Sequence, residues 1–360
     1  MRTGDRMYTP SRSATSPLPS VSPRVLHRRA GRSGRRSPLR LLSASLALVL
    51  IGSAAPTSAR ELTPIPVKTA DRPNYVSSPA AAGPWFGWAR YKNSVEESNY
   101  FVQKRTKARL RVNPKGTAAD GGGIYRHTLV YAQWRDDMRH SNLYRFNLRT
   151  GRRAPLPAPV NTPRRETDPT LSGRYLLFER RRTTGGPAIE SRVVVSKIML
   201  YDRRTGALRV LATARDGYSD GGGQIVYGGQ VNGAYAVWER ATVTDRITGA
   251  NVIRLNLHRD IKTKLVRPKG FLQRSPSVSP DGTVYFVRQS RDRAQQTIEQ
   301  IVKQPVGAQA EVLYTSPSHQ YIWDLYVDDR AKSRHVYFNR YDDRSNNTGI
   351  YKLIDPIPRS

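Results

Sequence analysis

The sequence contains no cysteine, and this absence removes several classes of protein from consideration. Without thiols the chain has no structural disulfide, no zinc–thiolate site, no cysteine nucleophile and no lipidated cysteine at a processed N-terminus. Histidine is also scarce, since the six residues are scattered and no pair stands at i, i+4 in a helical pattern. We therefore expect no zincin-type metal centre, and we predict no metal, no cofactor and no catalytic residue for this chain.

Long helical patterns are missing as well. Glycine and proline, 27 and 25 of the 360 residues, are spread throughout the chain, where they would interrupt helices. Only residues 291–302 could form a short helix, and that stretch fits a loop and a strand equally well. The sequence therefore predicts an all-β protein.

Acidic residues are few relative to basic ones, with 28 Asp and Glu against 60 Lys and Arg. The first 59 residues carry ten arginines and one aspartate, which leaves 50 basic and 27 acidic residues and a net charge of +23 in the remainder. This excess fits either an arginine-rich composition without further meaning or a basic surface for anionic polymers. Basic runs such as Arg180–Arg182 are short and lie in no nucleic-acid module, so we expect no specific nucleic-acid partner.

The N-terminal region has the order of an export signal. Residues 1–40 are rich in Ser, Pro and Arg and are expected to form a disordered basic leader. Residues 41–59 begin with the apolar run LLSASLALVLIGSAA and end in small residues, with a predicted cleavage after Ala59. The apolar run is shorter than the ~20 residues that span a bilayer comfortably. We expect an exported protein, secreted or in the cell envelope, attached to the membrane only if the signal remains uncleaved as an anchor.

A pattern repeats about every fifty residues in the remaining part, residues 60–360. Each copy is a short strand, a turn and an apolar, aromatic strand that ends in a charged or polar residue. The six copies are Gly83–Lys92, Thr128–Asp137, Ser172–Arg181, Asn232–Ala241, Asp281–Ser290 and Arg334–Asp343. Equivalent aromatic positions are assigned to Trp88, Trp134, Phe178, Trp238, Phe286 and Phe338.

A second hairpin follows most copies, with alternating apolar residues and a polar turn such as Thr150-Gly151 or Thr205-Gly206. Each unit therefore contains four antiparallel strands, and six units predict a six-bladed β-propeller. The sixth unit lacks a fourth strand, because Pro356-Ile357-Pro358 follows the third strand at Ile350–Asp355. We predict that Glu61–Lys68 supplies the missing outer strand and closes the ring.

The segment SPSVSPDGTVYFV (Ser275–Val287) resembles the repeat of TolB-like, or WD40-like, six-bladed propellers. Weaker copies are DPTLSGRYLLFER (Asp168–Arg180) and GGQVNGAYAVWER (Gly228–Arg240), and the resemblance covers roughly Pro73 to Ile354. Proteins with such repeats are often periplasmic or secreted and mostly act as binding scaffolds. The resemblance thus implies the fold and an extracytoplasmic binding role, whereas the ligand has to be inferred from the site.

Candidate ligand-binding residues come from the segments that lead into the innermost strands, which surround one mouth of the channel in such propellers. The predicted set is Asp120, Asp168, Asp220, Arg274, Trp323 and Asp324. Several aspartates around one axis repel one another unless a cation, an arginine or a ligand compensates them. A structural alternative stays open, because aspartate before glycine or proline often bonds nearby backbone amides in a turn.

Two functional hypotheses follow. The first is a non-catalytic binding or scaffolding module for a protein partner or an anionic cell-wall polymer, which the positive charge would attract. The second is a carbohydrate-active enzyme, a hydrolase or lyase, that uses carboxylates at the channel mouth as acid and base.

Overall fold

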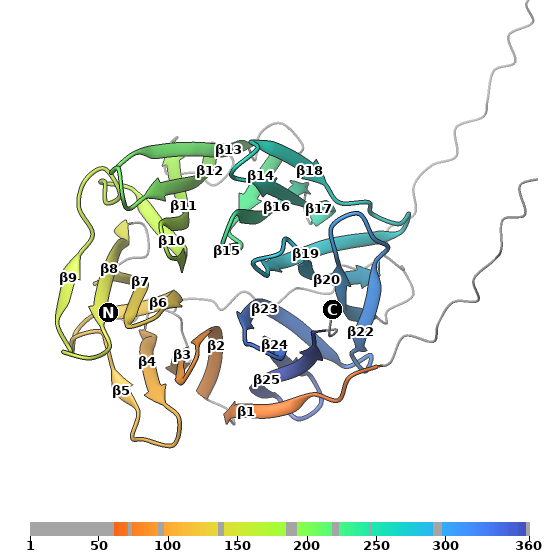
Figure 1. The fold of residues 1–360 in the computed structure, drawn as a ribbon, viewed down its shortest axis with the longest axis horizontal. Coiled ribbons are helices and arrows are strands. Elements are labelled where there is room, and N and C mark those ends of the chain that lie inside the picture. The colour runs from red at the N-terminus through yellow and green to blue at the C-terminus, as the bar shows by residue number, and fades with distance from the viewer. Residues whose placement is uncertain are drawn as a thin grey trace, which may run out of the picture. The chain divides into compact units, whose positions relative to one another are not determined.

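The described residues form 25 β-strands grouped into six antiparallel sheets around a central axis, as Figure 1 shows. The computed structural model describes residues 61–70, 74–92, 97–135, 140–184, 193–217, 223–244, 247–290 and 297–357. All of them belong to Pro56–Ser360, one of two units into which the chain divides. The predicted leader (1–40) and signal peptide (41–59) lie outside the described residues. The described part contains no helix with the length and apolarity that a bilayer crossing requires.

The strands follow one another from the inside of each sheet, or blade, to the outside. Blade 1 contains β2 (Asn74–Ala82), β3 (Trp85–Lys92), β4 (Asn99–Lys104) and β5 (Leu110–Arg111). Blade 2 contains β6 (Ala118–Tyr125), β7 (Thr128–Trp134), β8 (Asn142–Asn147) and β9 (Arg153–Pro155). Blade 3 contains β10 (Arg165–Ser172), β11 (Tyr175–Thr184), β12 (Val193–Asp202) and β13 (Leu208–Gly217).

The second half of the ring repeats this order with two variations. Blade 4 contains β14 (Gly223–Tyr227), β15 (Val231–Asn232), β16 (Tyr235–Val243), β17 (Ile247–Asn256) and β18 (Ile261–Lys264). Blade 5 contains β19 (Phe271–Val278), β20 (Val284–Ser290), β21 (Glu299–Gln304) and β22 (Glu311–Thr315). Blade 6 contains β23 (Gln320–Asp329), β24 (Ser333–Asp342), β25 (Asn347–Pro356) and β1 (Ile65–Ala70). The prediction of an all-β, six-bladed propeller is confirmed.

The second strand of each blade is buried on both faces, because neighbouring blades cover it from both sides. Its aromatic residue is enclosed, as Trp88, Phe178 and Phe338 illustrate. Blade 2 departs from the predicted alignment. The pairing Gly122↔Tyr131 gives the equivalent position to Tyr131, so the sequence alignment that chose Trp134 is three residues off.

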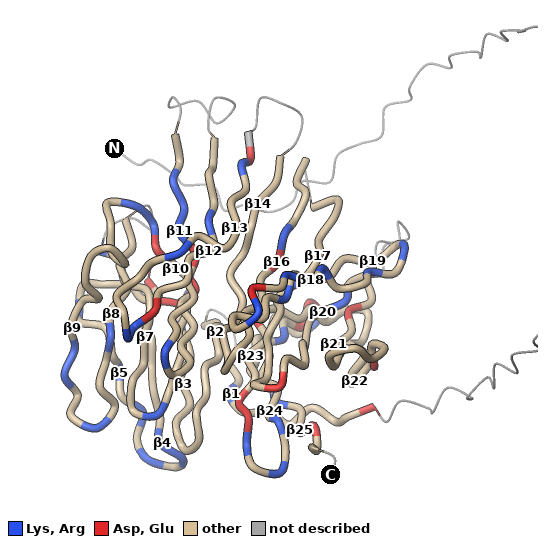
Figure 2. The backbone as a smooth tube through the Cα atoms, turned by 45° about the horizontal axis from the view of Figure 1, so that its top comes forward, with Lys and Arg blue, Asp and Glu red and all other residues tan. Residues whose placement is uncertain are grey.

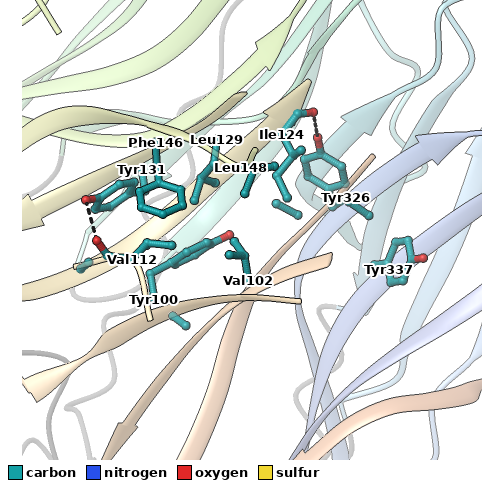
Figure 3. Packing of buried hydrophobic residues seen from close by; sticks show 14 residues of the cluster. Tyr100, Val102, Val112, Ile124, Leu129, Tyr131, Phe146, Leu148, Tyr326 and Tyr337 are labelled. Atoms are coloured by element: carbon teal, nitrogen blue, oxygen red, sulfur yellow. Dashed lines mark hydrogen bonds between the residues drawn. The ribbon is translucent and has the colours of Figure 1, made fainter. Parts of the chain in front are cut away.

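Large aromatic side chains join blades 1, 2 and 6 in one hydrophobic cluster (Figure 3). The rings of Tyr100 and Tyr131 stack with 6.2 Å between their centroids. Their buried hydroxyls need partners, and Tyr131 donates to the Val112 carbonyl at 3.4 Å. Tyr326 donates to the Ile124 carbonyl, also at 3.4 Å, and so links the inner strands of blades 6 and 2. Packing between blades therefore extends to the axis.

The strand nearest the start of the described chain closes the ring, as predicted from the incomplete sixth repeat, although it runs from Ile65 to Ala70 and not over the predicted Glu61–Lys68. β1 pairs with β25 from Ile65↔Lys352 to Ala70↔Thr348. The Lys68 ammonium donates to the Gln103 side chain of blade 1 at 2.7 Å and lies over the Trp88 ring. The strand thus completes blade 6 and also contacts blade 1.

The residues just before β1 are also used. The Leu62 amide donates to the Leu313 carbonyl at 2.7 Å, and the Glu61 carboxylate accepts a bond from the Thr315 amide at 2.6 Å. Both partners lie on β22, the outer strand of blade 5. The segment from Glu61 to Ala70 therefore contacts three blades.

Removing this segment tests the closure. A chain that starts at Glu61 should keep the Tm of the full chain, because Glu61 is the first residue with described contacts. A chain that starts after Ala70 leaves β25 as an unpaired edge, and its Tm should fall by roughly ten degrees, a few kcal/mol for a domain of this size. Thermal unfolding followed by circular dichroism measures both, and equal Tm values for the two chains would contradict closure by β1.

Candidate functional site

The innermost strands share an irregularity at one level of the channel. In five blades the pairing with the second strand shifts register, and the extra residue has a positive φ. These five residues are Ser78, Gly121, Asp168, Ser275 and Asp324. In blade 4 the strand is interrupted instead, and Gly228 lies between β14 and β15. Such a β-bulge redirects side chains that a regular strand would place elsewhere.

A positive φ is costly for any residue except glycine, so these bulges are maintained by their surroundings. The φ of Asp168 is 51° and that of Asp324 is 39°. Proline follows the bulge in three blades, at Pro79, Pro169 and Pro276, and occupies a position where no ladder hydrogen bond is needed. The repeated Ser-Pro and Asp-Pro pairs thus mark, in the sequence, the β-bulges of the inner strands.

A cup of about 310 Å³ lies at this level, and residues from the inner strands of all six blades line it. Four of the predicted residues are among them, namely Asp168, Arg274, Trp323 and Asp324. They lie within β10, β19 and β23, at the bulges, whereas the sequence placed them in segments that lead into the strands. The structure therefore brings together predicted residues from blades 3, 5 and 6.

Below the cup, side chains fill the axis. The Gln230 amide donates to the Val327 carbonyl at 2.9 Å, and its oxygen accepts bonds from the Ser277 hydroxyl and the Val278 amide. Ser277 in turn accepts a bond from the Val327 amide at 2.9 Å. This buried network joins blades 4, 5 and 6, so the mouth is a cup with a floor.

Asp120 has a different environment from the other predicted aspartates. Its carboxylate accepts bonds from the Ser78 hydroxyl at 2.6 Å and from the Gly121 amide at 2.7 Å. This is the turn-bonding arrangement that the sequence left open as an alternative. Asp120 lies behind the wall that Gly121 and Gly122 contribute to the cup.

Asp220, the remaining predicted residue, lies outside the described residues. At the level of the bulges, blade 4 instead contributes Tyr227, Gly228 and Gly229 to the cup. A Cβ on Gly228 would lie 2.8 Å from the Asp168 Cβ, and one on Gly229 would lie 2.2 Å from the Val237 carbonyl oxygen. Glycine is required there because the backbones approach closely.

Close packing also explains the glycines after Asp120. A Cβ on Gly122 would lie 2.4 Å from the Tyr100 hydroxyl, and one on Gly123 would lie 2.6 Å from the Leu171 amide nitrogen. The second contact involves backbone that cannot move aside easily. These glycines permit blades 1, 2 and 3 to approach one another at the axis.

The carboxyl groups of the mouth influence one another. Enclosure by the six inner strands raises the pKa of Asp324 to about 7, and the negative charges of Asp120 and Asp168 add to this effect. Enclosure also raises the pKa of Asp120, although the bonds from Ser78 and Gly121 oppose the shift. Tyr91 nearby has its pKa raised to about 12, mainly by burial and further by Asp120 and Asp324.

A buried glutamate that sequence reasoning missed completes the wall in blade 4. Glu239 is only 4% exposed, and burial raises its pKa to about 7 while Arg274 opposes the shift. One carboxylate oxygen accepts a bond from the Ser275 amide at 3.0 Å, and the other has no hydrogen-bond partner among the described residues. The signal was a charged residue directly after the buried aromatic of a second strand, in Trp238-Glu239.

Trp323 forms the aromatic part of the rim. Its side chain is 39% exposed, and its ring stacks on Tyr341 with 5.9 Å between centroids and 6° between the planes. The stack holds the indole in place while leaving part of it open to solvent. Trp88 and Trp238, by contrast, are buried between blades, as their position on the second strands predicts.

Two observations concern other chemistries. Within the described ranges, no group of three or more His, Asp or Glu residues is placed to hold a metal ion. The sequence GYSDG at Gly217–Gly221 has the Gly-x-Ser-x-Gly spacing of a nucleophile elbow. The predicted site residues do not include its serine. An elbow joins a strand to a helix. Residues 218–221 lie outside the described residues, and the described elements before and after them are the strands β13 and β14.

No protein-family model and no curated protein matches the chain. Among solved structures, it is similar to the β-propeller domain of the Trilobed protease from Pyrococcus furiosus. That match has 10% identity and a TM-score of 0.46, and covers 78% of this chain and 94% of that one. An oligogalacturonate lyase in complex with manganese shares 12% identity with a TM-score of 0.45, over 82% of this chain and 98% of that one.

A further oligogalacturonate lyase, from Vibrio parahaemolyticus, has 11% identity and a TM-score of 0.43, over 83% of this chain and 98% of that chain. With identities and TM-scores this low, the likenesses say nothing about what this chain binds. The chemistry of the site has to be derived from its own residues.

The raised pKa of Asp324 predicts a pH-dependent stability. The folded-state pKa of about 7 exceeds the ordinary 3.8, so the folded protein binds more protons between about pH 4 and pH 7, and its stability falls as pH rises through that window. Asp324→Asn removes this loss. The variant's Tm should therefore exceed that of the wild type by a few degrees at pH 8, and the difference should shrink toward pH 4.

Asp260→Asn is a matched control, because Asp260 is exposed on the β17–β18 turn and its replacement removes the same charge. Scanning calorimetry between pH 4 and pH 8 measures the Tm difference of each variant from the wild type. A Tm difference between Asp324→Asn and wild type that stays constant with pH would show that the carboxyl does not titrate in the cup.

Proposed function

We propose that this chain is an exported, non-catalytic β-propeller of the TolB-like repeat type that binds an anionic polymer of the cell envelope, with one sugar unit of the polymer in the channel mouth. The observation that carries the proposal is the cup, in which an exposed indole stands beside carboxyl groups and a guanidinium. The protein acts as a binding module at the cell surface or in secreted fluid.

The residues of the cup match the chemistry of a sugar. The open face of Trp323 offers an apolar surface for the C–H face of a sugar ring. Asp168, Glu239 and Asp324 accept hydrogen bonds from hydroxyls, and Arg274 donates them. The Arg274 Nε and one Glu239 oxygen are buried without hydrogen-bond partners among the described residues, so polar groups next to the cup still have bonding capacity. Small-molecule sites are typically ~300–1,000 Å³, so the cup suits one ring.

The positive charge supports a polymer that is anionic as a whole. The mature part carries +23, which attracts polyanions over several ångströms and weakens as salt screens it. The mouth itself is rich in carboxyl groups, so it would contact the uncharged part of such a polymer. Attraction and recognition therefore come from different parts of the surface.

Export is supported by the N-terminal signal pattern and agrees with the use of the first residues in the ring. Because Glu61 and Leu62 already bond to β22, cleavage after Ala59 would leave every described contact of the segment intact. The resemblance of Ser275–Val287 to TolB-like repeats supports the same compartment. The mature protein would begin at Arg60.

One observation favours a second function, a carbohydrate-active enzyme. Asp324 and Glu239 line the same cup and both have their pKa raised to about 7. A carboxylic acid that is half protonated near neutrality is suited to general acid–base catalysis. A hydrolase of this kind would need a pair of carboxyls roughly 5–9.5 Å apart across the glycosidic bond.

Co-sedimentation with purified cell-wall sacculi tests the proposal. Wild-type protein should sediment with sacculi that retain their anionic polymers and much less with sacculi from which acid has removed them. Trp323→Ala should weaken binding roughly tenfold, because the stacking surface is lost. High salt should lower the binding of both proteins.

The same mixtures distinguish binding from catalysis. Release of new reducing ends by the wild type, abolished in Asp324→Asn while sedimentation persists, would replace the proposal by the enzyme function. Asp260→Asn controls for the lost charge. Failure of the wild type to sediment with either kind of sacculi would leave a protein partner as the ligand.

A further inference from the structure

A second concavity, of about 340 Å³, lies on blade 3 away from the channel mouth. Five cationic side chains line it, and the remaining lining residues are Thr184, Val193 and Val195, so no acid lines it within the described part of the chain. The cationic residues are Arg164, Arg180, Arg182, Lys197 and Arg215. Figure 2 shows a run of basic residues on β11 and a single basic position on β12, the strand that pairs with it. We refer to these residues as the blade 3 groove.

The register of three strands places these charges on one sheet face. Arg180 lies directly opposite Lys197, and Val195 lies between Arg182 on one side and Arg215 on the other. Because residues paired across strands point to the same side, all four side chains lie on the face of blade 3 that carries Phe178, which packs against blade 2. Like charges directly opposite each other destabilise a sheet. This concentration of like charges therefore does not serve the stability of the sheet.

Arg180 is the one member with an ion pair among the described residues. It bonds to the buried Glu166 carboxylate at 2.8 Å and to the Pro159 and Val160 carbonyls. For the other four cations, the described parts of the chain provide no hydrogen bond and no ion pair. Arg182 and Arg215 are exposed at the surface of the groove. Within the described ranges, these four positive charges thus stand together without an acidic partner.

We propose that the blade 3 groove is an anion-binding site that takes successive phosphate groups of a linear phosphate polymer. One guanidinium group can donate two parallel hydrogen bonds to the oxygens of a phosphate, and four of the five cations are arginines. Neighbouring strands are about 4.8 Å apart, so the cations are spaced along a short path and face more than one anionic group.

Two features of the groove select phosphate over other polyanions. A phosphate group carries its charge in a smaller volume than a uronate residue, so a phosphate chain can meet more of the four cations within 340 Å³. Among the described residues no aromatic side chain lines the groove, so these residues offer the bases of a nucleic acid no stacking surface. The site is separate from the mouth, and the inference does not depend on a sugar binding there.

The test measures binding of long-chain inorganic polyphosphate by fluorescence anisotropy at low and high salt. The variant Arg182→Glu/Arg215→Glu should bind polyphosphate at least roughly tenfold more weakly. The slope of log binding constant against log salt concentration should become smaller by about two, one for each lost phosphate contact. The control Arg149→Glu/Arg152→Glu changes net charge equally at two exposed arginines of the β8–β9 turn and should bind like the wild type. Asp324→Asn should also bind like the wild type, which separates this site from the mouth.

Equal weakening in the two double variants would overturn the proposal, because overall charge would then explain the binding. Tighter binding of polygalacturonate or of a single-stranded oligonucleotide than of polyphosphate, lost in the groove variant, would overturn the phosphate assignment. If the glutamate variant does not fold, Arg182→Gln/Arg215→Gln replaces it, since glutamine keeps the length of the side chain and removes the charge. Binding by the glutamine variant equal to that of the wild type would also reject the groove.

Discussion

The crowding of six inner strands around one axis is the constraint on which the rest of the structure depends. Backbones approach there so closely that Gly123 and Gly229 have no room for a Cβ. Without bulges, the six inner strands would approach one another along their whole length. The bulges change the direction of the strands at one level of the channel. The same bulges place Asp168 and Asp324 around the mouth, so packing and site have a common origin.

Much of the fold could be read from the sequence because each blade repeats one local pattern. The closing strand could be found by counting, since an outer strand was missing from the sixth repeat and an unassigned apolar segment was available. The alignment failed in blade 2, where Trp134 is as buried as its supposed equivalents but Tyr131 occupies their place in the register. A sequence shows which residues are aromatic, and pairing decides which of them are equivalent.

The site was predictable only as far as it follows the inner strands. Asp168 and Asp324 were found because they stand at the same point of their repeats, but Glu239 lies on a second strand and reaches the cup through the close approach of blade 4. In blade 4 the pattern pointed to Asp220, whereas the level of the bulges is occupied by Gly228, after an interruption that the repeat did not indicate. The net charge likewise did not indicate where charged residues gather, although acids line the mouth and five cations line the groove on blade 3.

The pairing of β1 with β25 has a consequence for how the protein is made. The pairing of Ile65 with Lys352 joins the first and the last strand of the described chain, so blade 6 cannot be completed before β25 has been synthesised. Until then the segment that forms β1 has no partner strand, and β25 pairs with β24 alone until β1 adds to its other edge. Closure of the ring is therefore a late step of folding, because it joins the first and the last strand of the described chain.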